Sequence, residues 1–501
     1  MRARITALAV VAVLLAYAYV APGVRREFIR DVITWDAEPS EPVELRGGAG
    51  VGLAPIARTR VILIDGLSAQ TARTMPNWMA LCRKGLALDV DVGFPTVSLP
   101  VEVSLWTGLT QQQTGVMFRS DRPLVPPLSS SIPARVPGSL AVAEDHGFIV
   151  RSLGFSSALP TALPGSPAKD FDPEPWKGAW QTAALDAVSS DAKLVFVHVL
   201  RVDTWGHKKG RDSAEYRNAA SEADAILATM VAGAPDARWF LLSDHGHLAR
   251  GGHGGEDHSV RQVEHCIVGP GVVPGRAGLV HLVDMSHAIA DSVGVTVDKA
   301  SRGRPISVAR AMSLDPDEAV PPLALGTGAI AIFILALGLA ASAWSVRRVQ
   351  RVQWWLAPSW FVVGVLLFFI LNGEPTLSMP MVYARTGERL REAWEPALIL
   401  AAAATFVGLG RTTLLRVLVA QLALPFACLA AAITACGGWA PLLGAELAPV
   451  VPHYTAYVSP LLLFTAHGAA AVGLAVLARI ALAVFYRRRP AETPRTEPSA
   501  G

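Results

Sequence analysis

Long apolar segments without charge lie towards both ends of this 501-residue chain and enclose a more polar middle. Residues 5–21 contain no charged side chain and follow Arg2 and Arg4. Further apolar runs cover 323–345, 354–371, 396–410, 414–436 and 458–486. A helix needs about 20 mostly apolar residues to cross a bilayer. The sequence therefore predicts a multi-pass membrane protein with six spans, of which 396–410 is short for a span.

The first apolar run has two interpretations. Its length suits an uncleaved membrane anchor, whereas Ala16-Tyr17-Ala18 resembles the small-residue site at which signal peptides are cleaved. In both cases the segment that follows is exported.

Arginine clusters set the expected topology. With six spans, one side receives the amino terminus together with Arg347, Arg348, Arg351, Arg411, Arg416, Arg487, Arg488 and Arg489. Positive charge collects on the cytoplasmic side of a membrane. Both termini are therefore expected in the cytoplasm, and the polar middle of the chain outside it.

Composition divides the chain into five parts: an anchor or signal peptide over 1–22, a linker over 23–56, an exported domain over 57–310, a helical membrane domain over 321–486 and a polar tail over 487–501. Lys and Arg number 44 against 41 Asp and Glu, for a formal net charge of +3. This balance gives no electrostatic reason to expect a nucleic acid as partner. Four cysteines are too few for a disulfide scaffold; Cys82 and Cys266 could pair or remain buried thiols.

Short apolar runs alternate with amphipathic stretches in the exported domain. Strands are predicted over Arg60–Asp65, Phe148–Gly154, Leu194–Asp203, Trp239–Asp244 and Gln262–Val268, with helical patterns near 75–84, 99–108, 177–189, 213–232 and 284–293. Such alternation predicts an α/β domain with a mostly parallel sheet that helices cover on both faces.

Three of the predicted strands end in aspartate, at Asp65, Asp203 and Asp244. Open α/β sheets bind their ligands at the carboxyl ends of strands. Each aspartate alone could be a turn or capping residue. Three buried carboxylates at one edge, however, are costly unless cations neutralise them.

Histidines accompany these aspartates. His207 follows Asp203 by four residues, His245 comes directly after Asp244, and His253 lies in the glycine-rich stretch Gly251–Gly255. Aspartate oxygens and histidine nitrogens suit Zn²⁺ or a similar divalent ion. Three Asp and three His are enough for two ions, for which we expect Zn²⁺, with Mn²⁺ as the alternative.

Two more histidines, His247 and His258, flank the metal motif. They could support the ligands, act as a general acid, or simply lie in a solvent-exposed loop.

A serine at the start of a helical pattern is the predicted nucleophile. Ser98 precedes an apolar stretch with Pro100 in its first turn, which is typical of a helix amino terminus. Backbone N–H groups there can hold a phosphoryl oxygen, and a metal would lower the pKa of the hydroxyl. Ser98 could instead be only a helix cap, and Thr96 is the second candidate nucleophile.

Five motifs together, VILIDGL, FPTVSLP, VDTWGH, SDHG and GGHGG, resemble the alkaline phosphatase superfamily. The chain is most similar to type I phosphodiesterases/nucleotide pyrophosphatases and to GPI ethanolamine phosphate transferases, which also join an exported catalytic domain to many membrane spans. The resemblance implies an alkaline-phosphatase-like fold over about 57–310. It also implies one metal held by Asp203, His207 and His253, and another held by Asp65, Asp244 and His245 and bridged by Ser98.

The chain departs from its relatives beside the nucleophile. Nucleotide pyrophosphatases place an Asn that contacts phosphate where this chain has Val101. Sulfatases carry Arg where this chain has Glu102, which argues against a formylglycine sulfatase.

The predicted function is therefore a membrane-bound, two-metal phosphoryl transfer on phosphodiesters through a phosphorylated Ser98. The membrane setting favours a phosphoethanolamine-type transferase that uses a lipid, a lipid-linked glycan or an envelope polymer. Hydrolysis of small esters is the enzymatic alternative, and a non-catalytic membrane scaffold with a relic domain is the other.

Overall fold

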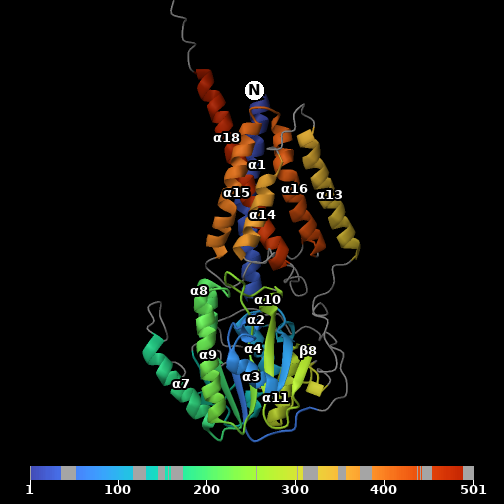
Figure 1. Cartoon of the computed structure of the whole chain (residues 1–501). Coiled ribbons are helices and arrows are strands. Elements are labelled where there is room, and N and C mark those ends of the chain that lie inside the picture. Colours follow the sequence, from blue (N-terminus) through green and yellow to red (C-terminus); the bar gives the residue numbers. More distant parts are fainter. Residues whose placement is uncertain are drawn as a thin grey trace, which may run out of the picture.

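The computed structural model describes residues 2–34, 52–114, 116, 131–144, 153–155, 157–158, 173–255, 257–301, 303–307, 325–347, 357–372, 386–436, 438–439, 442 and 454–488. Two bodies are visible, an α/β domain and a bundle of helices beside it (Figure 1).

An eight-stranded sheet forms the centre of the α/β domain, with the order β4-β3-β5-β1-β6-β7-β2-β8. Among the described strands, β7 runs antiparallel to both of its neighbours, and the other pairs are parallel. The strands are β1 Thr59–Ile64, β2 Leu86–Asp91, β3 Leu140–Ala143, β4 Ser157–Ala158, β5 Leu194–Val199, β6 Arg238–Leu242, β7 Gln262–Val268 and β8 Gly275–His281. The predicted mostly parallel α/β sheet is confirmed.

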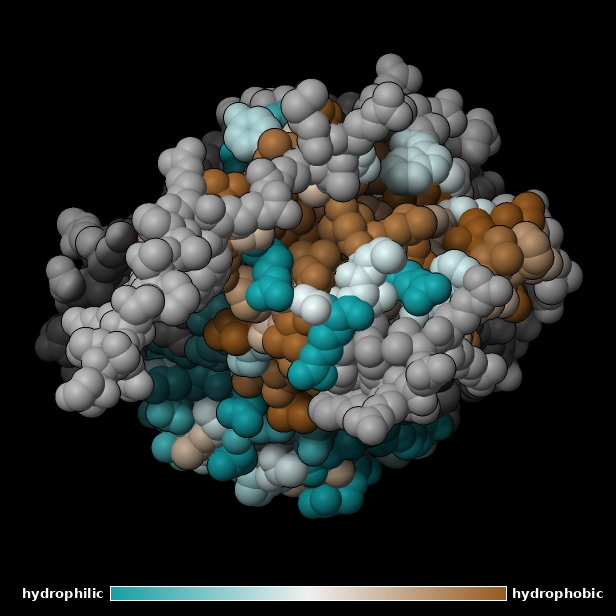
Figure 2. All heavy atoms as spheres, turned by 90° about the horizontal axis from the view of Figure 1, so that it is seen from above, coloured by the Kyte–Doolittle hydropathy of each residue, from teal (hydrophilic) through white to brown (hydrophobic). Residues whose placement is uncertain are grey.

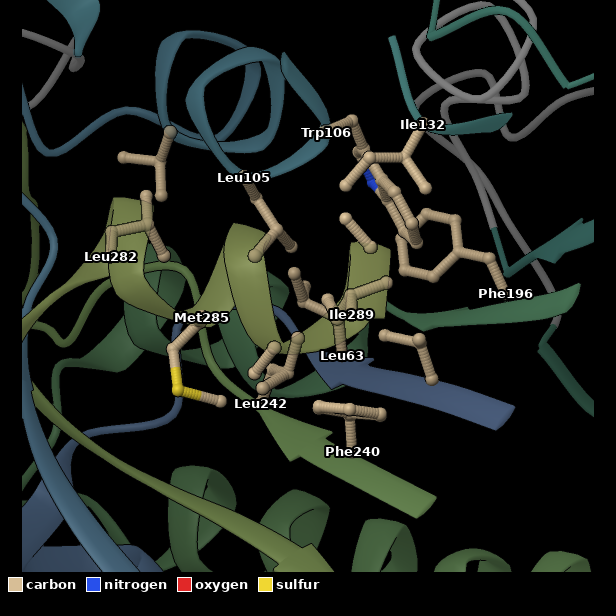
Figure 3. Packing of buried hydrophobic residues seen from close by; sticks show 14 of the residues in the cluster. Leu63, Leu105, Trp106, Ile132, Phe196, Phe240, Leu242, Leu282, Met285 and Ile289 are labelled. Carbon is tan, nitrogen blue, oxygen red and sulfur yellow. The ribbon is translucent and has the colours of Figure 1, made fainter. Parts of the chain in front are cut away.

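Helices cover both faces of this sheet because alternate strand residues point to opposite sides. Val61 and Leu63 of β1 face one apolar cluster, whereas Ile62 and Ile64 face another. The first cluster contains residues of α4 (Ser98–Thr107) and α11 (Leu282–Val293) (Figure 3). The second contains residues of α3 (Pro76–Lys84), α7 (Pro173–Ser189) and α9 (Ala214–Gly233).

Short helices complete the domain: α2 Ala69–Ala72, α5 Gln111–Thr114, α8 Arg201–Lys209 and α10 His258–Arg261. A disulfide joins Cys82 of α3 to Cys266 of β7, with 5.4 Å between their Cα atoms. Of the two states left open by the sequence, the paired one is therefore observed.

Several element boundaries differ from the sequence prediction. The strand predicted to end at Asp203 stops at Val199, and Asp203 lies in the first turn of α8. The helix begins there because the carboxylate of Glu144 accepts the N–H groups of Leu200 and Arg201 at 2.8 and 3.0 Å, which favours a helix amino terminus. Much of the strand predicted over Phe148–Gly154 lies outside the described residues.

The bundle contains α1 Arg2–Thr34, α13 Leu325–Arg347, α14 Ser359–Asn372, α15 Thr386–Gly408, α16 Leu414–Ala435 and α18 Ser459–Arg488. Helix α1 packs along α18, and α13 packs along α16. Tyr17 and Thr465 share a hydrogen bond of 2.7 Å between α1 and α18. The helix at the start of the chain is thus an integral part of the bundle.

Among the described residues, four helices are long and apolar enough to cross a membrane: Ile5–Phe28, Gly328–Val346, Leu414–Ala435 and Ser459–Phe485. Ser359–Leu371 of α14 is a shorter apolar helix, and α15 begins with a charged segment. The number of six spans stays a prediction. The linker predicted from residue 23 is corrected, because α1 continues to Thr34 with Pro22 inside it.

Large apolar side chains remain exposed on the bundle, with Ile332 and Phe333 of α13 at 69% and 63%. Figure 2 shows apolar side chains gathered over the bundle and polar ones on the domain beneath it. Exposed apolar side chains on helices of this length suit contact with lipid.

Helices α2, α8 and α10 lie at the end of the domain that faces the bundle (Figure 1). Since α2 and α8 follow β1 and β5 directly, the carboxyl ends of these strands point towards the bundle.

Candidate metal centre

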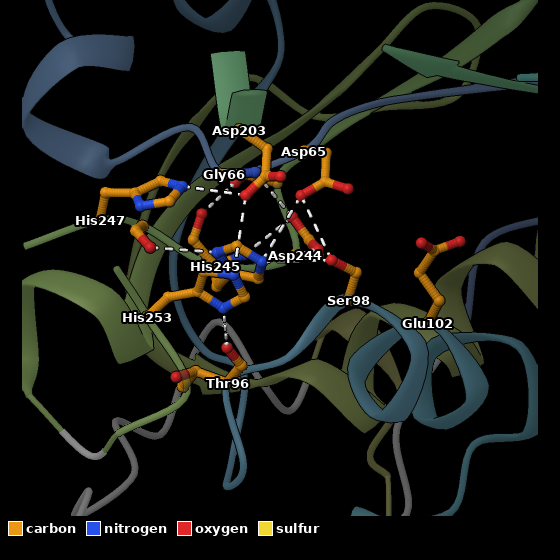
Figure 4. Close-up of polar contacts among 12 residues, drawn as sticks. Asp65, Gly66, Thr96, Ser98, Glu102, Asp203, Asp244, His245, His247 and His253 are labelled. Carbon is orange, nitrogen blue, oxygen red and sulfur yellow. Dashed lines mark hydrogen bonds and ion pairs between the residues drawn. The ribbon is translucent and has the colours of Figure 1, made fainter. Parts of the chain in front are cut away.

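Three adjacent parallel strands, β5, β1 and β6, deliver the predicted aspartates to one edge of the sheet. Asp65 follows β1 directly, Asp244 follows β6 by two residues, and Asp203 lies in the helix after β5. All three are buried. The structure therefore brings together the side chains that the sequence assigned to the two metals (Figure 4).

The first predicted ligand set converges around α8. The four-residue spacing places Asp203 and His207 on one helix face, and His207 Nε2 lies 3.3 Å from Asp203 Oδ2. His253 Nε2 lies 3.2 Å from His207 Nε2 and 3.7 Å from Asp203 Oδ1. The carboxylate of Asp203 and the two imidazoles thus lie close together, and Asp203 also shares a group of mutually close ligand-type atoms with His245, His247 and His253.

The second predicted set surrounds the serine. His245 Nε2 lies 3.3 Å from Asp244 Oδ2 and 3.5 Å from Asp65 Oδ1. Ser98 Oγ lies 3.3 Å from His245 Nε2 and 3.4 Å from Asp65 Oδ1. Since the imidazole rings of His245 and His253 stack at 3.7 Å, the two sets are immediate neighbours.

Ser98 is not the cap of its helix. Val97 occupies the cap position of α4 and Ser98 is the first helical residue. Its hydroxyl points to Asp65 and His245 instead of the helix backbone. The arrangement thus places a nucleophilic oxygen next to a ligand set and at the amino terminus of a helix, where backbone N–H groups favour anions.

The charges at this site are unbalanced without cations. Burial, followed by the charge of Asp203, raises the pKa of Asp65 to about 7. Burial and the charge of Asp65 raise the pKa of Asp244 well above its usual range. Among the described residues, Asp65 Oδ2 and Asp244 Oδ2 accept no hydrogen bond. A divalent cation would satisfy Asp244 Oδ2, so the residues present fit a metal site.

Thr96 is a supporting residue, which corrects its place as second candidate nucleophile. Its hydroxyl donates to Gly255 O at 2.8 Å and accepts the N–H of Gly254 at 2.9 Å, and its side chain is buried. Its carbonyl lies 2.7 Å from His253 Nδ1. Thr96 therefore clamps the glycine-rich loop and orients His253.

His247 supports a ligand, as one of its predicted roles required. Its Nδ1 accepts the N–H of Gly252 at 3.2 Å, so Nε2 carries the proton and donates to Asp203 Oδ1 at 2.9 Å. A Cβ on Gly206 would lie 2.3 Å from this ring. Only glycine at that position lets α8 approach His247 so closely.

Gly66 is the second glycine that this centre requires. Its φ of +70° lies in the left-handed region, and a Cβ there would lie 2.8 Å from Asp203 Cα. Its N–H donates to Asp244 Oδ1 at 3.0 Å, and its carbonyl accepts the hydroxyl of Tyr216 at 2.6 Å. Gly66 therefore permits the turn that holds two carboxylates together.

His258 is exposed at the start of α10. It lines a polar pocket of about 640 Å³ together with Ser68, Gln70, Arg73, Arg211 and Gln262. Of the alternatives left open for His258, its exposure agrees with a solvent-exposed histidine.

Glu102 and His198 are site residues that the sequence analysis missed. Both are buried, and with Asp65 they place their ligand-type atoms within 4.8 Å of one another. Each interrupts an otherwise apolar run, LPVEVSLW and LVFVHV. A polar residue in such a run needs a buried partner, and this signal could have identified the pair.

The family model of type I phosphodiesterases/nucleotide pyrophosphatases matches residues 158–265. This range contains Asp203, His207, Asp244, His245 and His253 but neither Asp65 nor Ser98. No curated protein matches the sequence.

Solved structures give fold similarities at low identity. Murine ectonucleotide pyrophosphatase/phosphodiesterase 5 is 12% identical with a TM-score of 0.39, over 48% of this chain and 96% of that one. A protein of the alkaline phosphatase superfamily from Vibrio parahaemolyticus is 14% identical with a TM-score of 0.37, over 59% of this chain and 80% of that one.

Proposed function

We propose that this chain, a metal-dependent phosphodiesterase or phosphotransferase of the alkaline phosphatase superfamily, transfers a phosphorylated head group from a membrane phospholipid to a hydroxyl acceptor through Ser98. The family-model match over the ligand motifs supports the class of enzyme. The transferase activity, the phospholipid donor, the extracytoplasmic position of the domain and the pair of Zn²⁺ ions belong to the proposal. The structure offers specific support for the donor.

The first step transfers the head group from the donor lipid to Ser98. Ser98 Oγ attacks the phosphorus of the donor diester, the bond from phosphorus to the glyceride oxygen breaks, and the serine proton goes to that leaving oxygen. The head group then remains on Ser98 as a phosphodiester. When bound, the cations would neutralise phosphate charge and favour the serine alkoxide. Asp203, His207 and His253 would hold one cation, and Asp65, Asp244 and His245 the other.

The second step restores the serine. An acceptor hydroxyl attacks the same phosphorus, the bond from phosphorus to Ser98 Oγ breaks, and the acceptor proton returns to Ser98. Backbone N–H groups in the first turn of α4 are placed to hold the phosphoryl oxygens in both steps.

The observation that carries the lipid donor is the position of Phe94, four residues before Ser98. Phe94 is buried in an apolar cluster with residues of the bundle, among them Phe28 of α1 and Trp394 of α15. The loop that carries the nucleophile therefore packs against the bundle. Since the carboxyl ends of β1 and β5 also face the bundle (Figure 1), a lipid head group is the substrate that this position favours.

Purified full-length protein in nanodiscs provides the test. The probe is phosphatidylethanolamine labelled in its head group, because the sequence resembles ethanolamine phosphate transferases. We expect the label to become covalently bound to wild-type protein and not to the Ser98→Ala variant, and diacylglycerol to be released.

The same experiment separates transfer from hydrolysis. An added hydroxyl acceptor, such as glycerol, should receive the label faster than water does. Free phosphoethanolamine as the sole product would favour a hydrolase. Cleavage of bis-p-nitrophenyl phosphate without any reaction of the lipid would contradict the proposed donor.

A further inference from the structure

A buried polar bridge lies behind the candidate metal centre, on the side of Asp65 away from Asp244 and His245. Its members are Glu102 of α4 and His198 of β5. Glu102 lies one helical turn after Ser98, so both residues face the same side of α4. His198 pairs with Leu63 in the strand that ends beside Asp65. Both side chains are at most 1% exposed.

The distances show how the bridge divides the carboxylate of Asp65. Oδ1 faces Ser98 Oγ at 3.4 Å and His245 Nε2 at 3.5 Å. Oδ2 faces His198 Nε2 at 3.3 Å, and the same nitrogen lies 3.2 Å from Glu102 Oε1. Oδ1 of Asp65 thus faces the candidate metal centre, and Oδ2 lies against His198 of the bridge.

Few other polar groups reach this place. Among the described residues, Asp65 Oδ2 and Glu102 Oε2 accept no hydrogen bond within normal limits. His198 is therefore the polar side chain that lies against both carboxylates. An apolar core would not retain a Glu and a His in this way, since each loses hydration on burial.

We propose that Glu102 and His198 are positioning residues that fix the orientation of Asp65 and couple it to the nucleophile helix. His198 Nε2–H donates to Glu102 Oε1 at 3.2 Å and lies 3.3 Å from Asp65 Oδ2, so Glu102 orients the imidazole and the imidazole holds Oδ2 in place. Oδ1 is thereby directed at the cation and at Ser98. This inference depends on the proposed function only for its activity readout.

The bridge also links two elements that must keep a fixed spacing. Ser98 and Glu102 lie on α4, whereas Asp65 directly follows β1 and His198 belongs to β5. Contacts at both ends of one helical turn hold α4 against rotation about its axis. A small rotation would move Ser98 Oγ away from the phosphorus, and such misplacement is costly in rate.

The test compares Glu102→Ala, Glu102→Gln and His198→Ala in the full-length protein, with Ser104→Ala as the matched control. Ser104 is also buried on α4 but donates to Pro100 O of its own helix. Zinc affinity is measured by competition with a chelator, bound zinc by elemental analysis, and folding by thermal unfolding. The probe for activity is bis-p-nitrophenyl phosphate, which gives kcat and KM separately.

We expect Glu102→Ala and His198→Ala to weaken binding of one zinc ion by roughly 10- to 100-fold, and to lower kcat by a similar factor with little change in KM. Glu102→Gln keeps an oxygen that accepts from His198 and should restore most of the affinity. Ser104→Ala should resemble the wild type. Because zinc affinity is measured without substrate, an incorrect substrate class would leave this result unchanged.

Three results would overturn the role. Wild-type zinc affinity and kcat in both alanine variants would show that the bridge is only part of the core. Equal losses in Glu102→Ala and Glu102→Gln would make the charge of Glu102 responsible instead of its contact. A third zinc ion in the wild type that Glu102→Ala loses would make the cluster a ligand set. If His198→Ala fails to fold, the comparison of Glu102→Ala with Glu102→Gln tests the positioning role.

Discussion

Nε2 of His253 lies 3.2 Å from Nε2 of His207, so the two imidazole rings face each other through their Nε2 nitrogens. His253 Nδ1 lies 2.7 Å from the carbonyl of Thr96 and donates its proton there. Its Nε2 therefore presents a lone pair to His207. A cation between the rings would satisfy both nitrogens together with Asp203.

Removal of metal should therefore destabilise the α/β domain. An ion whose free concentration is a thousand times its Kd adds about 4 kcal/mol to the free energy of unfolding. For a domain of this size, that corresponds to a rise in Tm of roughly 10 °C. We expect EDTA to lower Tm by that order and zinc to restore it. The measurement is thermal unfolding in detergent, with His207→Ala expected to show a smaller response. An unchanged Tm in EDTA, with no metal found by elemental analysis, would contradict the metal centre.

Ser98 and Thr96 should respond differently to substitution by alanine. Ser98→Ala removes the attacking oxygen and should lower kcat by roughly a thousand-fold or more, without loss of bound zinc. Thr96→Ala removes a clamp on the glycine-rich loop and should weaken zinc binding while a labelled phosphoenzyme still forms. Mass spectrometry of the trapped phosphoenzyme distinguishes the two. Label on Ser98→Ala would identify a different nucleophile.

Phe94→Ala should uncouple the nucleophile loop from the bundle. Because Phe94 is 7% exposed and belongs to the apolar cluster of the bundle, its loss lets the loop shift relative to a lipid head group. We expect the rate with phosphatidylethanolamine to fall roughly tenfold, and the rate with a soluble diester to fall less. Val273→Ala, at a position 64% exposed, is the control and should change neither rate. An equal fall with both substrates would argue against a role for the bundle in presenting the donor.

Mild acid should destabilise the domain through His265. Burial lowers the pKa of this residue to about 4, whereas an unfolded histidine titrates near 6.5. Between these values the unfolded chain binds the extra proton. The contribution of His265 is therefore complete above about pH 6.5 and is lost towards pH 4, at about 1.4 kcal/mol per unit.

His265→Gln tests this assignment, because an amide can still donate to Ser243 O, which His265 Nε2 contacts at 2.7 Å. When Tm is recorded against pH, the Tm of the variant should fall less steeply between pH 6.5 and 4 than the Tm of the wild type. Val273→Ala, at an exposed position that does not titrate, supplies the control and should keep the wild-type slope. Parallel curves for wild type and His265→Gln would show that His265 does not contribute.

Much of the centre could be predicted because its ligands come in short motifs. Asp203 and His207 are four residues apart, and Asp244 and His245 are adjacent. Short spacing of this kind predicts the contact even where the secondary structure is predicted wrongly. Asp203 lies in a helix and not at the end of a strand, yet its carboxylate still lies beside His207. The parallel neighbours β5, β1 and β6 then follow from strands that alternate with helices.

The bridge between Glu102 and His198 could not be predicted in the same way. These residues are 96 positions apart, and each stands alone in an apolar run, so no local pattern joins them. The strands β2, β3, β4 and β8 were missed for a related reason. Strands β3 and β4 are short and β8 is partly exposed. Strand β2 is buried, but its pairing with β7 and β8 depends on distant partners. Helix α1 extends past Pro22 because its contacts with the bundle outweigh the local composition.

The pairing of α1 with α18 has a consequence for biogenesis. The ribosome makes α1 before the α/β domain and α18 after every other helix of the bundle. Until synthesis reaches residue 459 and beyond, α1 lacks the helix along which it packs. A truncated product that ends before α18 would expose the side of α1 that packs against α18, and such an exposed apolar surface favours aggregation or degradation.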